Sequence, residues 1–178
     1  NASAALTPVP WFSAFVDALV VATLPNSSVQ GILAQAGLRF RPTDSLSIAL
    51  GRERNFRAPG MLVNPSDFIH PAQTVPGQRM QRAGVWLTRA SFQRQKYTVD
   101  AMFLPFRDLD AAGIPRSVAA EDLGFATRGY LSLWDTDLGI SFGYFNRDWQ
   151  TGVSVSRYLF KRFEAHLEAG YSASTGGR

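Results

Sequence analysis

Apolar residues recur at every second position along most of this chain. In segment 138–144, large apolar residues alternate with two glycines and a serine. The same period occurs in segments 46–53, 97–103 and 163–171. Because successive side chains of an extended strand point to opposite faces, this period predicts strands with one apolar face and one polar or small face.

Weaker versions of the same period extend the predicted sheet. They occur in segments 16–24, 34–41, 82–90, 124–134 and 149–156, the first of which is the least regular. Together the segments predict about nine strands, and no segment shows a helical period. We therefore predict an all-β chain with a segment at 1–15 before the sheet, strands within 16–172, and the start of a loop at 173–178.

The connections between the predicted strands differ in length. Segments 42–45 and 135–137 are short and contain the proline, aspartate and serine that tight turns favour. Segments 55–79 and 105–122 are long. Short turns at one end and long loops at the other are typical of an antiparallel up-and-down meander.

Composition narrows the possible classes of protein. The chain has 178 residues, and the absence of cysteine excludes disulfide frameworks, thiolate metal sites and thiol nucleophiles. Charged residues make up 18%, below the usual ~25% of globular proteins, whereas aromatic residues reach 12%. The formal net charge is only +4 and the basic residues are spread along the chain, so no nucleic-acid partner is predicted.

The two predicted faces separate a membrane barrel from a soluble sheet. The apolar face is bounded at strand ends by aromatic residues, namely Phe40, Tyr97, Phe103, Tyr144, Phe163 and Tyr171. The opposite face combines glycine, serine and alanine with isolated ionisable groups. An outer-membrane barrel has an apolar band toward lipid, aromatic girdles and a polar lumen. The pattern therefore predicts an antiparallel up-and-down transmembrane β-barrel.

Two hairpins, in segments 38–48 and 153–171, resemble the periplasmic hairpins of Gram-negative outer-membrane β-barrels. Segments 51–54 and 64–68 are similar to what porin-like and alginate-export-like barrels show after an early strand. The resemblance implies a bacterial outer membrane as the location, with its lipid and lipopolysaccharide as surroundings.

The predicted strand number departs from this family. Single-chain bacterial barrels have even strand numbers, and about nine is odd. Barrels of the family also finish on a strand with a terminal aromatic residue, whereas 173–178 reads as the start of a loop. We therefore expect a partial barrel that further strands or other subunits complete.

Ionisable residues on the polar face are the candidates for a lumen that selects ions. They are Arg39, Arg41, Arg52, Arg54, Asp100, Arg128, Glu164, His166 and Glu168. Arginine rings favour anions in a pore, and guanidinium groups bind carboxylates or phosphates in a fork geometry. Alternatively, the arginines pair with neighbouring carboxylates and hold the wall together. Both interpretations stay open at this stage.

The long segment 55–79 is a candidate constriction loop. Its apolar residues lie among four prolines, which argues against disorder. We expect it either to fold into the barrel and narrow it or to cap the outer rim. The candidate residues are Arg57, Asn64, Asp67, Phe68 and Arg79, with Asp67 and Arg79 as anchors.

Two further patterns suggest chemistry but are better explained otherwise. Segment 139–143 matches the G-x-S-x-G motif of hydrolases, with Asp148 and His166 following Ser141. That motif needs a sharp strand-to-helix turn, and Ser141 lies within a predicted strand, so a hydrolase is only a minor alternative. Glu164, His166 and Glu168 share one strand face but lack further ligands, so no metal or cofactor is predicted.

The sequence thus predicts a porin-like channel for passive passage of small hydrophilic solutes, with anionic solutes as a possible preference. Two alternatives remain. One is a barrel that anchors or sheathes an outer-membrane complex, and the other is a barrel that exports an anionic polysaccharide. Neither channel nor alternatives require an enzymatic step.

Overall fold

The computed structural model describes residues 2–23, 28–53, 84–105, 123–145, 148–159 and 163–174. These residues form ten strands: β1 (Ala2–Val9), β2 (Phe12–Thr23), β3 (Ser28–Thr43), β4 (Leu46–Glu53), β5 (Val85–Gln93), β6 (Tyr97–Leu104), β7 (Gly124–Leu133), β8 (Thr136–Phe145), β9 (Asp148–Leu159) and β10 (Phe163–Ser174). No helix in this part of the chain is long and apolar enough to cross a membrane.

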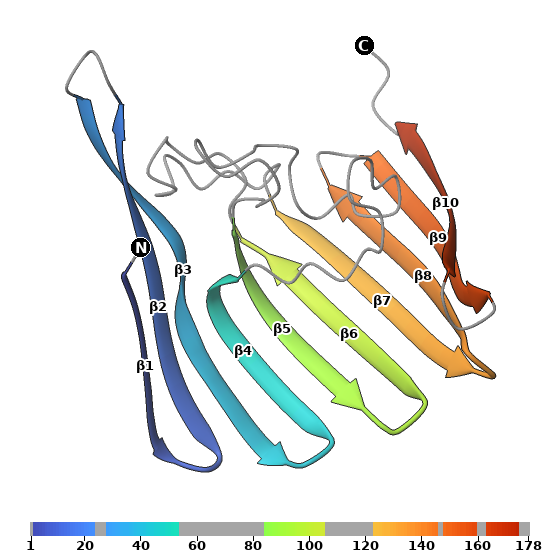
Figure 1. Ribbon diagram of the computed structural model, residues 1–178, viewed down its shortest axis with the longest axis horizontal. Coiled ribbons are helices and arrows are strands. Elements are labelled where there is room, and N and C mark those ends of the chain that lie inside the picture. The colour runs from blue at the N-terminus through green and yellow to red at the C-terminus, as the bar shows by residue number, and fades with distance from the viewer. Residues whose placement is uncertain are drawn as a thin grey trace.

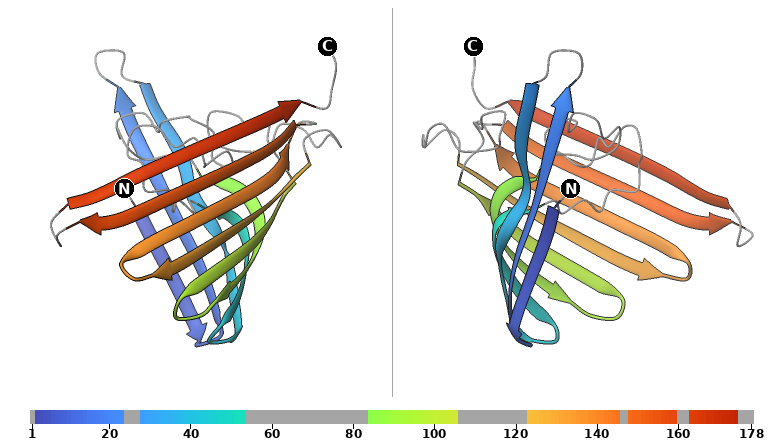
Figure 2. Two further views of the ribbon diagram at one scale, coloured as in Figure 1. Left: turned by 90° about the vertical axis from the view of Figure 1, so that its right-hand side faces the viewer. Right: turned by 60° about the vertical axis from the view of Figure 1, so that its left-hand side comes forward.

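The strands form one antiparallel up-and-down sheet. Hydrogen-bonded neighbours follow the sequence order from β1 to β10 (Figure 1). The all-β, up-and-down prediction is confirmed. The ten described strands do not close into a barrel, because β1 and β10 lie at opposite edges of the sheet. Figure 2 shows that the sheet is twisted and curved, so that β10 runs at a steep angle to β1–β3.

The structure has one strand more than the sequence predicts. Residues 1–15 were expected before the sheet, but they contain β1 and the start of β2. Small residues dominate β1, so it lacks the period of two that marks the other strands. Its backbone nevertheless pairs with β2, from Ala2 opposite Ala18 to Val9 opposite Phe12.

The four hairpin turns among the described residues, which join β1–β2, β3–β4, β5–β6 and β7–β8, lie at one end of the sheet, here called the turn end (Figure 1). In the β7–β8 turn, Trp134 and Asp135 have φ values of 48° and 61°. Two successive residues with positive φ are the geometry of a two-residue hairpin whose twist matches that of its strands. The two predicted long loops, 55–79 and 105–122, lie almost entirely outside the described residues.

A pair of glycines lets β3 and β4 approach closely. Gly37 and Gly51 are direct cross-strand partners, and Gly51 has a φ of 139°, which L side chains rarely adopt. A Cβ on Gly51 would lie against the carbonyl oxygen of Ala36, and one on Gly37 would lie 2.6 Å from that of Leu50. Glycine is therefore required at Gly51 by conformation and by space.

Candidate functional site on the inner face

The sheet has one buried and one exposed face. In β6 burial alternates at every position, so that Asp100 is 0% exposed while the adjacent Val99 is 48% exposed. Burial also alternates along β5, β7 and β9, and the register assigns each of their residues to one of the two faces. We call the face that carries Asp100 the inner face and the face that carries Val99 the outer face.

Charged side chains of alternating sign follow one another across the inner face. In β4, Glu53 accepts a hydrogen bond from Arg39 of β3, with 3.1 Å between Nη2 and Oε1. Its other oxygen, Oε2, accepts two from Arg89 of β5, at 3.0 Å from Nε and 2.9 Å from Nη2. Arg89 also approaches Asp100 of β6, with 3.7 Å between Nη1 and Oδ1. Arg128 of β7 lies directly opposite Asp100 in the register. We call these five residues the charge ladder.

The charge ladder is buried unevenly. The side chains of Glu53 and Arg89 are 3% and 8% exposed, whereas that of Arg39 is 32% exposed. The guanidinium of Arg39 also lies over the ring of Phe15, 5.4 Å from its centroid. Charged hydrogen bonds of this kind compensate the cost of taking ions out of water. The ladder therefore supports the interpretation in which arginines pair with carboxylates and hold the wall.

Asp100 differs from Glu53 in its hydrogen bonding. Both of its carboxylate oxygens are buried, and neither has a hydrogen-bond partner among the residues that the structure describes. Arg89 supplies an opposite charge 3.7 Å from Oδ1, and Arg128, which is 4% exposed, lies opposite Asp100 in the register. A buried carboxylate without hydrogen bonds is stabilised by opposite charges close to it.

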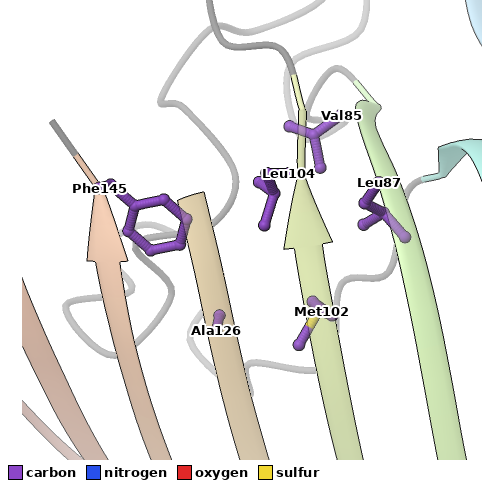
Figure 3. Close-up of a cluster of buried hydrophobic side chains, with 6 residues drawn as sticks. All are labelled: Val85, Leu87, Met102, Leu104, Ala126 and Phe145. Atoms are coloured by element: carbon purple, nitrogen blue, oxygen red, sulfur yellow. The ribbon is translucent and has the colours of Figure 1, made fainter. Parts of the chain in front are cut away.

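Arg89 belongs to the charge ladder, but the sequence pattern does not single it out. It follows Val85 and Leu87 on the same strand face, so that its face reads as apolar from the sequence. The structure shows that the inner face is itself apolar at the end of β5–β8 opposite the turn end. There a buried cluster is formed by Val85, Leu87, Met102, Leu104, Ala126 and Phe145 (Figure 3). The expectation that small residues and isolated ionisable groups make up the inner face therefore does not hold at this end of it.

Two predicted lumen residues lie elsewhere. The register shifts between Phe40 and Thr43, and Arg41 is exposed at the turn end, where its backbone N–H donates to the carbonyl of Trp11 at 2.7 Å. Arg52 is 2% exposed and breaks the alternation of β4, and its Nε donates to the carbonyl oxygen of Gly84 at 3.1 Å. This bond ties the end of β4 to the residue before β5. The remaining candidates, Arg54, Arg57, Asn64, Asp67, Phe68 and Arg79, lie outside the described residues.

The three candidates on β10 share the inner face, as the sequence predicts. His166 and Glu168 are the cross-strand partners of Ser156 and Ser154, which are buried inner-face residues. Glu164 accepts a hydrogen bond from Ser156 at 3.4 Å and lies 3.5 Å from Nε2 of His166. In the described part of the chain, no three acidic or histidine side chains come close enough to hold a metal ion.

By register, carboxylates outnumber arginines on the inner face of the described strands. The carboxylates are Asp17, Glu53, Asp100, Asp137, Asp148, Glu164 and Glu168. The arginines are Arg39, Arg89 and Arg128. This distribution gives no support to a preference for anions.

The outer face carries few charged side chains and many exposed apolar ones. From β5 to β10, the register places a single charged residue on the described outer face, Arg157, near the turn end. Large apolar side chains stand exposed between the strand ends, including Ile140 at 63% and Leu167 at 72%.

Aromatic side chains gather at both ends of this outer face. Away from the turn end, the ring of Trp149 packs on Tyr144, Phe142 and Phe125, with centroids 4.6, 5.1 and 5.8 Å apart. Toward the turn end, Phe92 lies 6.1 Å from Tyr97. The apolar band between the two groups is thus bounded by aromatic residues.

The residues of the hydrolase-like pattern do not come together. Ser141 lies opposite Gly152 of β9 and donates to its carbonyl at 3.4 Å. His166 lies opposite Ser156, and Asp148 begins β9, so the two flank the level of Ser141 on opposite sides. At about 3.3 Å per residue, each is ~13 Å away along the strand. No catalytic triad of these three residues exists in the structure.

No protein-family model, curated protein or solved structure matches this chain. The function is therefore inferred from the faces of the sheet and from the residues described above.

Proposed function

We propose that this chain forms the wall of a bacterial outer-membrane β-barrel and that the barrel allows passive passage of small hydrophilic solutes. The observation that carries the proposal is the distribution of side chains between the two faces. Ionic and hydroxyl side chains are buried on the inner face, while large apolar side chains are exposed on the outer face.

The free energy of hydration favours lipid at the outer face. Soluble monomers rarely expose a contiguous apolar patch larger than a few hundred Å². Here exposed apolar residues continue across six adjacent strands with one charged residue among them. Exposure of this face to water costs roughly 25 cal/mol of free energy for each Å² of apolar surface. Contact with hydrocarbon removes this cost.

The dimensions of the strands fit a membrane. Strands β9 and β10 each have 12 residues. At about 3.3 Å per residue they are ~40 Å long, which a tilt of about 45° reduces to ~28 Å across the bilayer. The aromatic groups at both ends of the outer face correspond to the girdles at the lipid–water boundaries.

Passage of solutes is supported by the hydroxyl, glycine and ionic side chains of the inner face. Since Arg39 and Arg89 of the charge ladder contact Glu53 and Asp100, we propose weak ion selectivity in place of a mild preference for anions. The same pairing argues against export of an anionic polysaccharide, which would need a series of available arginines. Outer-membrane lipid and lipopolysaccharide are the proposed surroundings, and small hydrophilic solutes the proposed ligands.

An anchoring barrel that conducts little is the second candidate. The observation that favours it is the apolar inner cluster of Figure 3, because apolar side chains at that level narrow or dry a lumen. Conductance across a planar bilayer separates the two functions. Stepwise conductance by the purified chain supports the channel, whereas insertion without conductance supports the anchor.

Single cysteines introduced at neighbouring positions test more directly whether the outer face contacts lipid. The chain has no native cysteine, so single cysteines can be labelled with a fluorophore at Val153 and Ser154, adjacent residues on opposite faces. In vesicles, we expect nitroxide lipids to quench the label at Val153→Cys strongly and the label at Ser154→Cys weakly. Equal quenching at the two positions would refute the assignment of the outer face to lipid.

A further inference from the structure

A polar pocket opens at the turn end, formed by the β1–β2 turn, the β3–β4 hairpin and the end of β5. These elements are neighbours at the lower edge of the sheet in Figure 1. Its volume of about 490 Å³ falls within the range of small-molecule sites. We call it the turn-end pocket. Its lining includes Trp11, Arg41, Asp44, Ser45, Ser91 and Gln93.

Backbone hydrogen bonds hold the walls of this pocket in place. The N–H of Arg41 donates to the carbonyl of Trp11 at 2.7 Å, which joins the two hairpins. The N–H of Gln93 donates to the carbonyl of Ser45 at 2.8 Å, which joins the turn to β5. Within the turn, the N–H of Leu46 donates to Oγ1 of Thr43 at 3.1 Å. The shape is therefore fixed before a ligand arrives, which lowers the entropic cost of binding.

The functional groups of the pocket are mixed in sign and in hydrogen-bonding type. Arg41 and Asp44 carry opposite charges, and both are exposed. Gln93 and the serine hydroxyls supply donors and acceptors alike. A phosphate or carboxylate would meet the charge of Asp44, and a metal ion would meet that of Arg41. A neutral ligand with many hydroxyl groups matches both types of partner.

Trp11 adds an aromatic wall. It is 52% exposed and lines the pocket. The ring of Phe40 packs against it edge to face, with centroids 5.6 Å apart. The indole ring offers an apolar surface on which the C–H face of a sugar can pack. The polar side chains beside it can bond the hydroxyl groups of the same sugar. We propose that the turn-end pocket binds a neutral saccharide of one or two rings. This inference concerns a separate site and does not require the chain to conduct.

The test is binding of maltose to the full chain in detergent, measured by isothermal titration calorimetry and by tryptophan fluorescence. We expect the fluorescence change to disappear in Trp11→Phe. Because a charge-assisted hydrogen bond is worth about a factor of ten in affinity, Asp44→Asn and Arg41→Gln should each weaken binding about tenfold. Arg94→Gln is the matched control, since Arg94 lies at the next turn, over the ring of Phe92. This variant should bind maltose as the native chain does.

Charged analogues decide the class of ligand. Gluconate and glucosamine should bind more weakly than glucose, because each meets a charge of its own sign in the pocket. Tighter binding of gluconate, with loss only in Arg41→Gln, would mean an anion site and overturn the proposal. Unchanged affinity in both pocket variants would overturn it as well. Since calorimetry does not depend on conductance, a chain that binds maltose without conducting would refute the channel and keep the pocket.

Discussion

Replacement of Glu53 by glutamine should destabilise the sheet strongly. Glu53 contacts both Arg39 and Arg89, and it receives three hydrogen bonds from them. Glutamine keeps the shape and one acceptor oxygen but removes the charge. Arg89 would then stay buried with Asp100, 3.7 Å away, as its remaining ion-pair partner among the described residues.

The size of the effect follows from burial. Breaking a buried ion pair by removing one partner costs about 3–5 kcal/mol. This range applies to Arg89, whose side chain is 8% exposed. The contact with Arg39, which is 32% exposed, adds at most ~1 kcal/mol because solvent screens it. We therefore expect Glu53→Gln to lower the free energy of unfolding by about 3 kcal/mol or more.

Urea unfolding of the detergent-embedded chain, followed by tryptophan fluorescence, measures this change. With a slope of about 2 kcal/mol per M, the midpoint should fall by ~1.5 M. Glu164→Gln is the control, because Glu164 is exposed at the edge strand β10 and should shift the midpoint by less than ~0.5 M. A midpoint for Glu53→Gln within ~0.25 M of the native value would refute the view that the charge ladder stabilises the sheet.

Three further outcomes are expected. Gly51→Ala should cost about 2 kcal/mol or more in urea unfolding, because φ is 139° and the new Cβ meets the carbonyl of Ala36, whereas Gly129→Ala, whose nearest contact would be 3.4 Å away, should cost much less. Trp149→Ala should cost about 3 kcal/mol in thermal unfolding, since it removes three ring contacts, while Trp134→Ala, which is 89% exposed in a turn, should stay near the native value. A fluorophosphonate probe should label the native chain no more than Ser141→Ala, because His166 and Asp148 are far from Ser141 along β9, and labelling lost in the variant would contradict this.

The strands that the sequence predicts best are those whose faces differ most. In β6 burial alternates at every position, and in β8 it alternates from Ile140 to Phe142, where apolar residues flank Ser141. Strand β1 was missed because alanine, small and apolar, reads the same on either face. Its place in the sheet is set by backbone pairing with β2, which leaves no trace in hydrophobic periodicity.

The candidate site was predicted in part for a related reason. Periodicity assigns Arg39, Asp100 and Arg128 to the polar face, and the structure places them there. It cannot say which strands are aligned at which level, so the contact of Glu53 with Arg89, 36 residues later, is visible only in the fold. Local irregularities are equally hidden, since the register shift after Phe40 moves Arg41 to the turn end.

The two edge strands of the sheet, β1 and β10, need partners if the sheet lies in a membrane. A strand edge in hydrocarbon leaves backbone N–H and C=O groups unpaired, at several kcal/mol for each group, so the proposed location requires partners for β1 and β10. Strand β1 runs toward the turn end and β10 away from it. Pairing of these two edges, within one chain or between chains, would therefore be antiparallel like the nine pairs already present. An even number of strands permits this closure, whereas the nine that the sequence predicts would have brought parallel strands together.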